Sequence, residues 1–388
     1  MNEPFDVLVV GGGVIGLSAA IAMRKRCYSV AVMDKGSLNP VNDSKSARVF
    51  AVNHASQVLL QELEVWQSLE KKRLAPYRAM HVWDAQTSAH IDFDSRMIGG
   101  DYLGVILEEL AIKQALLQKA KEMDVVFYPH CAVDAVDEQT DKVMIQSKSG
   151  HVAARLLIVA DGALSATRSL LNVPVTTWPY HQHAVVATVL CEKPHQNTAY
   201  QVFNREGPLA FLPLANQNTC SIVWSTAQAK ANWLLNLPDE LFNQHLTKAF
   251  AAKLGDCCVQ SPRFCFPLFM RHAQQYSGRR WLLMGDAAHT IHPLAGLGLN
   301  VGLADLNSWI KITEKACHLD SMDKLLKAYQ RQRKHAVWQT ITLMETLKAL
   351  FANPLAPIAS LRGLGLKLCN NALFLKRFFI FHAAGKGF

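Results

Sequence analysis

A glycine-rich turn that directly follows an apolar run near the N-terminus constrains the fold more than any other feature of the sequence. Residues 5–10, FDVLVV, are typical of a strand that is covered on both faces in a parallel sheet. GGGVIG follows at residues 11–16, then a segment with helical spacing, then VAVMD at residues 30–34. The order of strand, glycine turn, helix and strand predicts a βαβ unit of a Rossmann-type α/β domain.

The glycines and the acidic residue of this unit have separate expected roles in binding a dinucleotide. Gly11 permits a tight turn, Gly13 lets the backbone approach a pyrophosphate, and Gly16 allows close packing of a helix whose N-terminus supplies N–H donors. Asp34 ends the second strand and can accept hydrogen bonds from ribose hydroxyls, which favours FAD or NAD over NADP. The neighbouring Lys35 is either a contact to the adenosine end or a solvated side chain. The expected cofactor contacts of this unit are Gly11, Gly13, Val14, Ile15, Gly16, Asp34 and Lys35.

Two later segments repeat the pattern of a strand that ends in a turn containing glycine and aspartate. One is DGALSATR at residues 161–168, and the other is GDAAH at residues 285–289, whose pattern continues to Asp305. The first glycine turn alone does not separate FAD from NAD. Taken in order along the chain, the three segments resemble the signatures of the single-component FAD-dependent aromatic hydroxylases, the para-hydroxybenzoate hydroxylase-like flavoproteins.

Nearly the whole chain resembles, more narrowly, the ring hydroxylases of ubiquinone biosynthesis. The segments SARVFAV (46–52), FLPL (211–214) and LKRFFIFHAAG (375–385) carry this resemblance. It implies a monooxygenase in which NAD(P)H reduces FAD and O₂ then forms a C4a-hydroperoxyflavin. The expected product is a polyprenyl-phenol or quinol intermediate hydroxylated on its aromatic ring.

The resemblance also implies roles for individual residues of the later segments. Asp161 would help to hold the cofactor, with Arg168 supporting its segment through ion pairing, and Asp286 would accept a hydrogen bond from a ribityl hydroxyl. Leu297 stands where the family usually has glutamine. The further implied cofactor contacts are Arg48, Val133, Gly285, Gly298, Leu299 and Asn300, with a plain core valine as the alternative for Val133. The implied catalytic positions are Pro293, Gly296 and Leu297.

A second region, residues 76–99 and 173–270, consists of short alternating segments separated by Pro, Asn and Gly. This texture predicts a mostly antiparallel sheet inserted into a discontinuous FAD-binding domain of residues 1–75, 100–172 and 271–345. One helix of the FAD-binding domain is expected at residues 107–123. The inserted sheet would cover the substrate. Its expected pocket residues are Leu212, Pro213 and Trp224, with ordinary sheet packing as the alternative for all three.

The last segment, residues 346–388, carries basic residues, Arg362 and Lys376 among them, between Leu, Phe and Ile and has no acidic residue. Leu361, Leu364 and Leu368 have helical spacing, which predicts a basic amphipathic helical tail. Such a tail could pack against the flavin domain, lie on an anionic membrane surface, or dock on another protein of quinone biosynthesis. The polyprenylated substrate that the resemblance implies favours the membrane.

Composition narrows the remaining choices. Forty Lys and Arg against 31 Asp and Glu give a net charge of +9, which indicates an anionic partner. Nine cysteines without a C-x-x-C pair favour a reducing, cytoplasmic setting, and the tail would make the protein peripheral at the inner face of the membrane.

No metal site is expected at His289 and His292, because no cysteine or carboxylate cluster accompanies them. Nucleic-acid binding is not expected either, because the basic residues are spread along the chain. Two alternatives to the ring hydroxylase stay open. One is a flavoprotein of the same fold that acts on small aromatics or prenyl chains, and the other is a non-catalytic scaffold subunit of a quinone-biosynthesis assembly.

Overall fold

Parallel strands with a helix between them form the centre of the first part of the molecule. The computed structural model describes residues 3–38, 48–87, 89–291, 296–314, 322–353 and 355–385. A seven-stranded sheet has the order β8-β2-β1-β11-β10-β9, with β18 also paired to β11. The strands are β1 (Phe5–Val10), β2 (Val30–Met33), β8 (Val126–Tyr128), β9 (Ala135–Glu138), β10 (Val143–Ser147), β11 (Gly150–Val159) and β18 (Trp281–Leu283).

The valine-rich β1 lies in the middle of this sheet, parallel to both β2 and β11. Its residues from Val7 to Val10 are buried, as expected of a strand that is covered on both faces. The helices of this part are α1 (Val14–Arg24), α3 (Glu109–Glu122), α4 (Ala166–Leu170), α7 (Leu297–Thr313) and α8 (Met322–Ala352). The α/β fold class predicted from the sequence is therefore confirmed.

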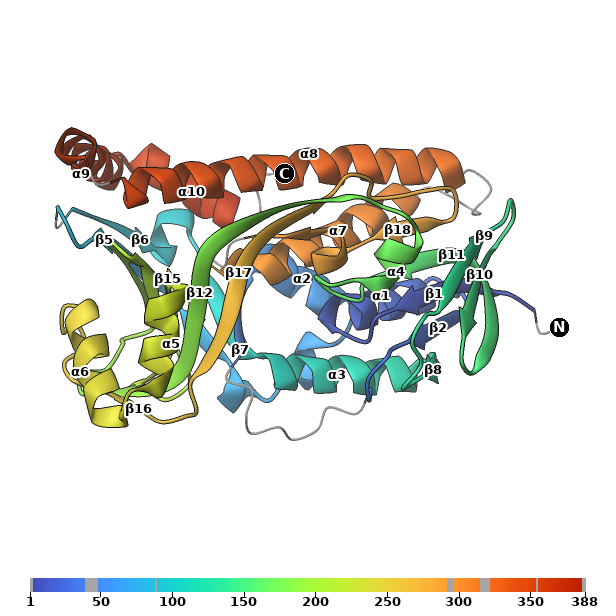
Figure 1. Cartoon of the computed structure of the whole chain (residues 1–388), viewed down its shortest axis with the longest axis horizontal. Helices are drawn as coiled ribbons and strands as arrows, with labels where there is room; N and C mark the ends of the chain where they lie inside the picture. The colour runs from blue at the N-terminus through green and yellow to red at the C-terminus, as the bar shows by residue number, and fades with distance from the viewer. Residues whose placement is uncertain are drawn as a thin grey trace.

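The second part of the molecule is built on a nine-stranded sheet. Its order is β19-β17-β12-β15-β14-β13-β5-β6, with β16 paired to β12. Every pair is antiparallel except β13 with β5. The strands are β5 (Ala79–Asp84), β6 (His90–Asp94), β12 (Val175–Cys191), β13 (Thr198–Asn204), β14 (Gly207–Pro213), β15 (Thr219–Ala227), β16 (Cys257–Val259), β17 (Phe264–Ala273) and β19 (His289–Thr290). The helices α5 (Gln228–Asn236) and α6 (Asp239–Ala249) lie beside it (Figure 1).

A small three-stranded sheet lies beside both larger units. It has the order β3-β7-β4 and is followed along the chain from β3 by a short helix, α2. Their bounds are β3 (Val49–Asn53), α2 (His54–Glu62), β4 (Ala75–Tyr77) and β7 (Gly104–Glu108). The helix expected at residues 107–123 thus begins at Glu109, because Leu107 and Glu108 pair with β3 in the sheet. Short 3-10 turns complete the framework at Trp66–Ser68, Lys71–Arg73, Ser95–Ile98 and Gly285–Ala287.

The C-terminal helices do not form a separate tail beginning at residue 346. The long helix α8 continues through that position to Ala352, and only then do α9 (Ala356–Asn371) and α10 (Leu373–Ala383) follow. Figure 1 shows α8 running along one side of both parts, with α9 and α10 above the β5–β6 end of the nine-stranded sheet. The boundary expected at residue 346 thus falls within an uninterrupted helix.

Candidate active site

The first glycine turn lies against the C-terminal end of β11. Gly11 has φ +113°, and a Cβ there would lie 2.3 Å from the carbonyl oxygen of Ala160. At Gly16, a Cβ would lie 1.8 Å from the Gly11 carbonyl oxygen, so both positions exclude a side chain. By contrast, no described atom lies within 4 Å of a Cβ built at Gly13. The turn is closed on the protein side and open at Gly13, where α1 begins with its N–H donors.

The second turn begins at Asp161, next to the first. The Asp161 carboxylate accepts a hydrogen bond from the Thr167 backbone N–H at 3.1 Å through Oδ2. Its Oδ1 is buried and has no hydrogen-bond partner among the described residues. Because a Cβ at Gly11 would also meet the Asp161 backbone nitrogen at 2.8 Å, the first and second turns are in contact.

Arg168 connects the second turn to the third. Its buried guanidinium donates to the carbonyl oxygens of Ala287 at 2.7 Å and Ala163 at 3.2 Å. Burial lowers the pKa of Arg168, and the nearby charge of Asp161 opposes that effect. The expected support of this segment is present, but it is made by hydrogen bonds to carbonyl oxygens rather than by a direct ion pair.

The third turn lies beside the first through a single side chain, Ile15. A Cβ at Gly285, which has φ +59°, would lie 3.1 Å from Ile15 Cγ1. On the following helix, a Cβ at Gly302 would lie 2.9 Å from Ile15 Cδ1 and 3.2 Å from the Gly285 Cα. Segments separated by more than 250 residues in the chain therefore meet at the start of α1.

Beneath the third turn, Asp305 anchors the backbone with a fully buried carboxylate. Its Oδ2 accepts from the Gly285 N–H at 2.9 Å and lies 2.7 Å from His289 Nε2, while Oδ1 accepts from Arg333 Nε at 2.6 Å. Burial alone would raise the pKa of Asp305, but His289 and Arg333 hold it below its usual range. Sequence reasoning gave Asp305 no role, because nothing in the residues around it indicates a partner on α8.

The start of α7 is fixed to β3. Gly296, at φ +63°, precedes the helix, and its Cβ would lie 3.0 Å from the Ala51 Cβ. The Asn300 side chain donates to the Ala51 carbonyl oxygen at 2.7 Å and accepts from the Asn53 N–H at 3.0 Å. The Asn300 side chain is thus occupied by the protein itself. Its backbone N–H takes the first intrahelical bond, to Gly296, so the N–H groups that the helix leaves without a partner at its start are those of Leu297, Gly298 and Leu299. At Gly298 no described atom lies within 4 Å of a Cβ.

Asp34 and Lys35 follow β2 at the edge of the first turn. The Asp34 carboxylate accepts from the Gly12 N–H at 2.5 Å and the Gly36 N–H at 2.7 Å, while Lys35 is exposed. Val133 does not lie in the strand that follows α3. That strand is β8, which ends at Tyr128, and Val133 is a half-buried residue in the loop before β9.

Asp286 and Arg48 come within electrostatic range of one another from different elements. Burial raises the pKa of Asp286 above its usual range, and the positive charge of Arg48 opposes the rise. The Arg48 guanidinium lies 3.7 Å from a Glu109 carboxylate oxygen and 5.2 Å from the centre of the Phe50 ring.

Pro293 and His292, which the sequence analysis also singled out, lie outside the described residues.

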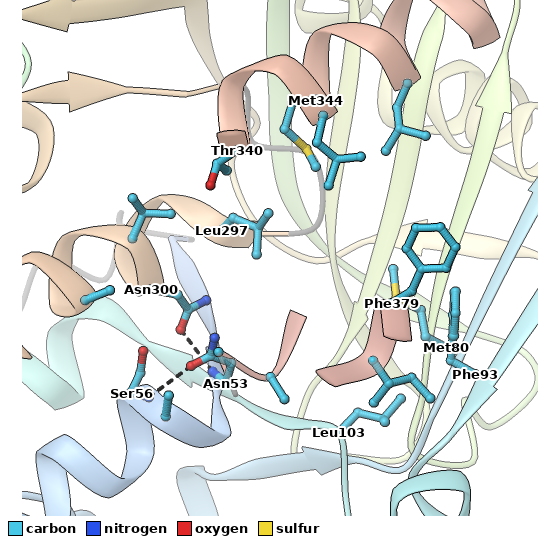
Figure 2. A pocket seen from close by; sticks show the side chains of 18 of the residues that line it. Asn53, Ser56, Met80, Phe93, Leu103, Leu297, Asn300, Thr340, Met344 and Phe379 are labelled. Atoms are coloured by element: carbon cyan, nitrogen blue, oxygen red, sulfur yellow. Dashed lines mark hydrogen bonds between the residues drawn. The ribbon is translucent and has the colours of Figure 1, made fainter. Parts of the chain in front are cut away.

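A cavity of about 630 Å³ opens beside the start of α7. Figure 2 shows Leu297 and Asn300 reaching it from α7, Thr340 and Met344 from α8, Met80 and Phe93 from the nine-stranded sheet, and Phe379 from α10. Its lining is mostly apolar, as is usual for small-molecule sites. The sequence analysis singled out Leu297 and Asn300 but missed the lining residues of the sheet and of the C-terminal helices. For the C-terminal helices, the apolar positions of that segment were the signal.

The three expected pocket residues of the nine-stranded sheet are divided between its two faces. Trp224 does not line the pocket, contrary to expectation. Its side chain packs on the face of the sheet that bears α6, where its ring lies 6.4 Å from that of Phe242. By strand alternation Pro213 shares that face with Phe211. Leu212 faces the other way and packs against a cluster that contains Ala51. Only Leu212 therefore lies near the Gly296 turn.

Three converging turns of this kind define a class of protein. Residues 4–344 match the FAD binding domain family, and the chain is a flavoprotein with FAD as its cofactor. The fold resembles that of p-nitrophenol 4-monooxygenase from Pseudomonas putida, with a TM-score of 0.80, 17% identity and 99% of both chains covered.

Relatives in sequence narrow the class. The chain is 33% identical to 3-demethoxyubiquinol 3-hydroxylase of Escherichia coli over 99% of both chains. It is 30% identical to the mitochondrial ubiquinone biosynthesis monooxygenase COQ6 of Danio rerio, over 95% of this chain and 87% of that one. The protein belongs to the family of FAD-dependent ring hydroxylases of ubiquinone biosynthesis, as the sequence predicted.

Proposed function

We propose that this protein hydroxylates the aromatic ring of a polyprenyl-phenol or quinol intermediate of ubiquinone biosynthesis, using FAD, NAD(P)H and O₂. The observation that carries the proposal is the apolar cavity that opens at Leu297, beside the helix start to which the three turns lead. The relatives named above act, by their names, on ubiquinone precursors.

The residues of the three turns suit a flavin dinucleotide. The open space at Gly13 leaves room for the pyrophosphate beside the α1 N-terminus. Asp161 Oδ1 is a buried acceptor that needs a donor, which a bound ligand would supply. In this proposal FAD is also held by Asp34 at the ribose and by Asp286 at the ribityl chain. The remaining proposed contacts are Gly11, Val14, Ile15, Gly16, Lys35, Arg48, Val133, Gly285, Gly298, Leu299 and Asn300.

When bound, FAD supplies the redox chemistry and oxygen activation that no side chain can perform. The chain itself contributes the N–H groups and positive dipole end of α7, which stabilise negative charge next to them. The backbone at Gly296 and Leu297 shapes the place where oxygen reacts. The family resemblance implies the same role for Pro293, which lies outside the described residues. The apolar walls of the cavity exclude water and hold the substrate ring in position.

The purified protein tests the proposal directly. It should be yellow, its NAD(P)H oxidation should rise when the phenolic substrate is added, and the product should contain one more ring hydroxyl. A colourless protein would support the scaffold alternative. A yellow protein that reduces prenyl double bonds without consuming O₂ would support the alternative of a flavoprotein that acts on prenyl chains.

A second experiment identifies the ring position. The gene is introduced into strains that each lack one ring hydroxylase of the pathway, and the quinone made in each is analysed. Restoration of ubiquinone in one strain would name the position. Growth with the unchanged intermediate in every strain would contradict the proposal.

The C-terminal helices also support a peripheral association with an anionic membrane surface inside the cell. Leu364, Leu368 and Phe374 are 55%, 60% and 72% exposed, and the exposed Lys367 and Arg377 lie in the same two helices. Arg362 and Lys376, which the sequence analysis counted as part of a basic face, are instead buried. None of the helices in the described part of the chain is long and apolar enough to cross a membrane.

Liposome flotation tests this association. Replacing Leu364, Leu368 and Phe374 together by serine should abolish flotation with anionic vesicles. The matched control, Leu241→Ser, removes an exposed leucine of α6 and should leave flotation unchanged. Equal flotation of both variants would count against the C-terminal helices as the membrane contact.

A further inference from the structure

We infer that the part of the cavity between the β5–β6 end of the sheet and the C-terminal helices is the binding site of the substrate's prenyl chain. On this view α8, α9 and α10 are a wall of the catalytic unit and not only a membrane attachment. The inference rests on the proposed function and adds a location for the chain.

The shape of this part of the cavity suits an extended chain. Along α8, lining residues run from Thr340 to Phe351, a distance of roughly 16 Å at 1.5 Å per residue. A cavity of about 150 Å³ is enough to hold a benzene ring. The whole cavity, about 630 Å³, is therefore roughly four times larger than a ring requires.

The chemistry of the walls suits a hydrocarbon. Val82, Ile91 and Phe203 of the sheet pack with Met344 and Phe351 of α8 in one buried apolar cluster. Partly buried members of the same cluster supply further lining, and these are Met80, Phe93, Leu297, Leu343, Leu347, Leu366 and Cys369. Because Leu297 belongs to this cluster, the apolar surface is continuous with the start of α7, where the ring is proposed to react.

Arg362, the one cation among the described residues that line this end of the cavity, is already neutralised. Its side chain is fully buried and lies 2.7 Å from Asp84 Oδ2. It also donates to the carbonyl oxygens of Leu350 at 2.9 Å and Phe351 at 3.1 Å. With its charge paired in this way, Arg362 favours no anionic ligand here.

The same contacts fix the helical wall to the sheet. Asp84 ends β5, so its pair with Arg362 ties α9 to the sheet across 278 positions of the chain. The Phe351 ring stacks on Phe203 of β13 at 3.8 Å between centres, and the Asp92 N–H of β6 donates to Asn370 at 3.1 Å. The wall is held to the sheet at the end of α8, in the middle of α9 and at the C-terminal end of α9, as a specific chain site requires.

Filling the site tests the inference. One ring substrate is prepared with a ten-carbon chain and with a methyl group in its place, and kcat/KM is measured for both. Met344→Trp should lower the ratio of the long-chain to the methyl value at least tenfold. Ala349→Trp, on the exposed side of the same helix, should keep the wild-type ratio. A ratio that is unchanged in Met344→Trp would overturn the inference.

A binding measurement separates this inference from the proposed function. The melting temperature of the FAD-loaded protein is measured with a decyl-chain ubiquinone and with a ubiquinone that has no chain. The wild type should be stabilised more by the decyl compound, and Cys369→Phe, which narrows the site from α9, should lose that difference. If Met344→Trp does not retain FAD, the ratio of kcat/KM for the long-chain and methyl substrates is measured with Cys369→Phe instead. If the wild type hydroxylates the long-chain and the methyl substrate equally well, the chain site is refuted and the proposed function stands. If it hydroxylates neither substrate, the proposed function is refuted.

Discussion

Two glycines of the first turn, three residues apart, have opposite surroundings. Gly16 touches the Gly11 carbonyl oxygen, while Gly13 has open space and an extended backbone that alanine also adopts. Gly13→Ala should therefore lower the stability of the apoprotein by only about 0.5–1 kcal/mol, because alanine is a poorer helix N-cap than glycine but displaces no atom here. It should weaken FAD binding at least tenfold, because the methyl group occupies the space proposed for the pyrophosphate.

Fluorescence titration of the apoprotein with FAD, together with its melting curve, checks this prediction. Gly16→Ala is the contrasting variant, and it should lower the melting temperature as well as the FAD affinity. Wild-type affinity in Gly13→Ala would show that the pyrophosphate binds elsewhere.

His272 gives the stability of the protein a defined dependence on pH. This side chain is 2% exposed, and its Nε2 has no partner among the described residues. Burial, with the charges of His289 and Lys334, lowers the pKa of His272 from 6.5 to about 4. Between those values the unfolded chain binds a proton that the folded chain does not, so stability falls as the pH drops from 6.5 to 4 and then levels off for this group.

The expected loss is about 3.5 kcal/mol, because each unit by which the pKa of His272 differs between the unfolded and folded chain corresponds to about 1.4 kcal/mol. Urea unfolding at several pH values measures it. His272→Leu should remove this part of the slope, whereas His335→Leu, at an exposed position of α8, should retain it. Parallel slopes in wild type and His272→Leu would contradict the prediction.

At the scale of single elements, the attachment of α9 depends on one buried ion pair. Removing the cation with Arg362→Met leaves Asp84 buried and unpaired, which typically costs about 3–5 kcal/mol. Because the pair joins α9 to a distant strand, the lost stability should appear first as local exposure of residues 350–385 rather than as global unfolding.

Hydrogen exchange and limited proteolysis locate that exposure. Lys367→Met, on the exposed side of α9, is the control and should change neither. Adding Asp84→Asn to Arg362→Met should restore part of the protection, since the uncompensated charge is then removed. Equal protection of the C-terminal helices in wild type and Arg362→Met would disprove the role of the pair.

At the scale of the whole molecule, FAD should stabilise the fold because its proposed site joins three distant segments. A ligand at a thousandfold excess over its Kd adds about 4 kcal/mol to the free energy of unfolding. Removing FAD by dialysis against chaotropic salt should therefore lower the melting temperature by several degrees, and added FAD should restore it. A melting temperature that does not depend on FAD would contradict the proposal that the three turns bind the cofactor.

Local patterns made the flavin part of the molecule predictable. The strand at residues 5–10, the turn at 11–16 and the helix after it depend on neighbouring residues only, and the structure has β1 and α1 where they were expected. Val133 was misplaced because a short strand and the loop after it have no distinct periodicity. Trp224 was misassigned because strand residues alternate between faces, so a one-position uncertainty reverses the direction of a side chain.

Contacts between distant residues were not predictable from one sequence. Nothing near Arg362 indicates that its partner is Asp84, 278 positions earlier, so a buried ion pair was interpreted as part of a basic face. The cavity was missed for the same reason, since its walls come from the strands β5, β6 and β13 and from the helices α2, α7, α8, α9 and α10.

The contact of Ile15 with Gly285 and Gly302 has a consequence for synthesis on the ribosome. The segment that begins the flavin site leaves the exit tunnel early, yet it must wait for almost 290 further residues before its partners are translated. A nascent chain therefore carries an incomplete nucleotide pocket through most of its elongation. Premature termination anywhere before the third turn yields a fragment whose pocket stays incomplete.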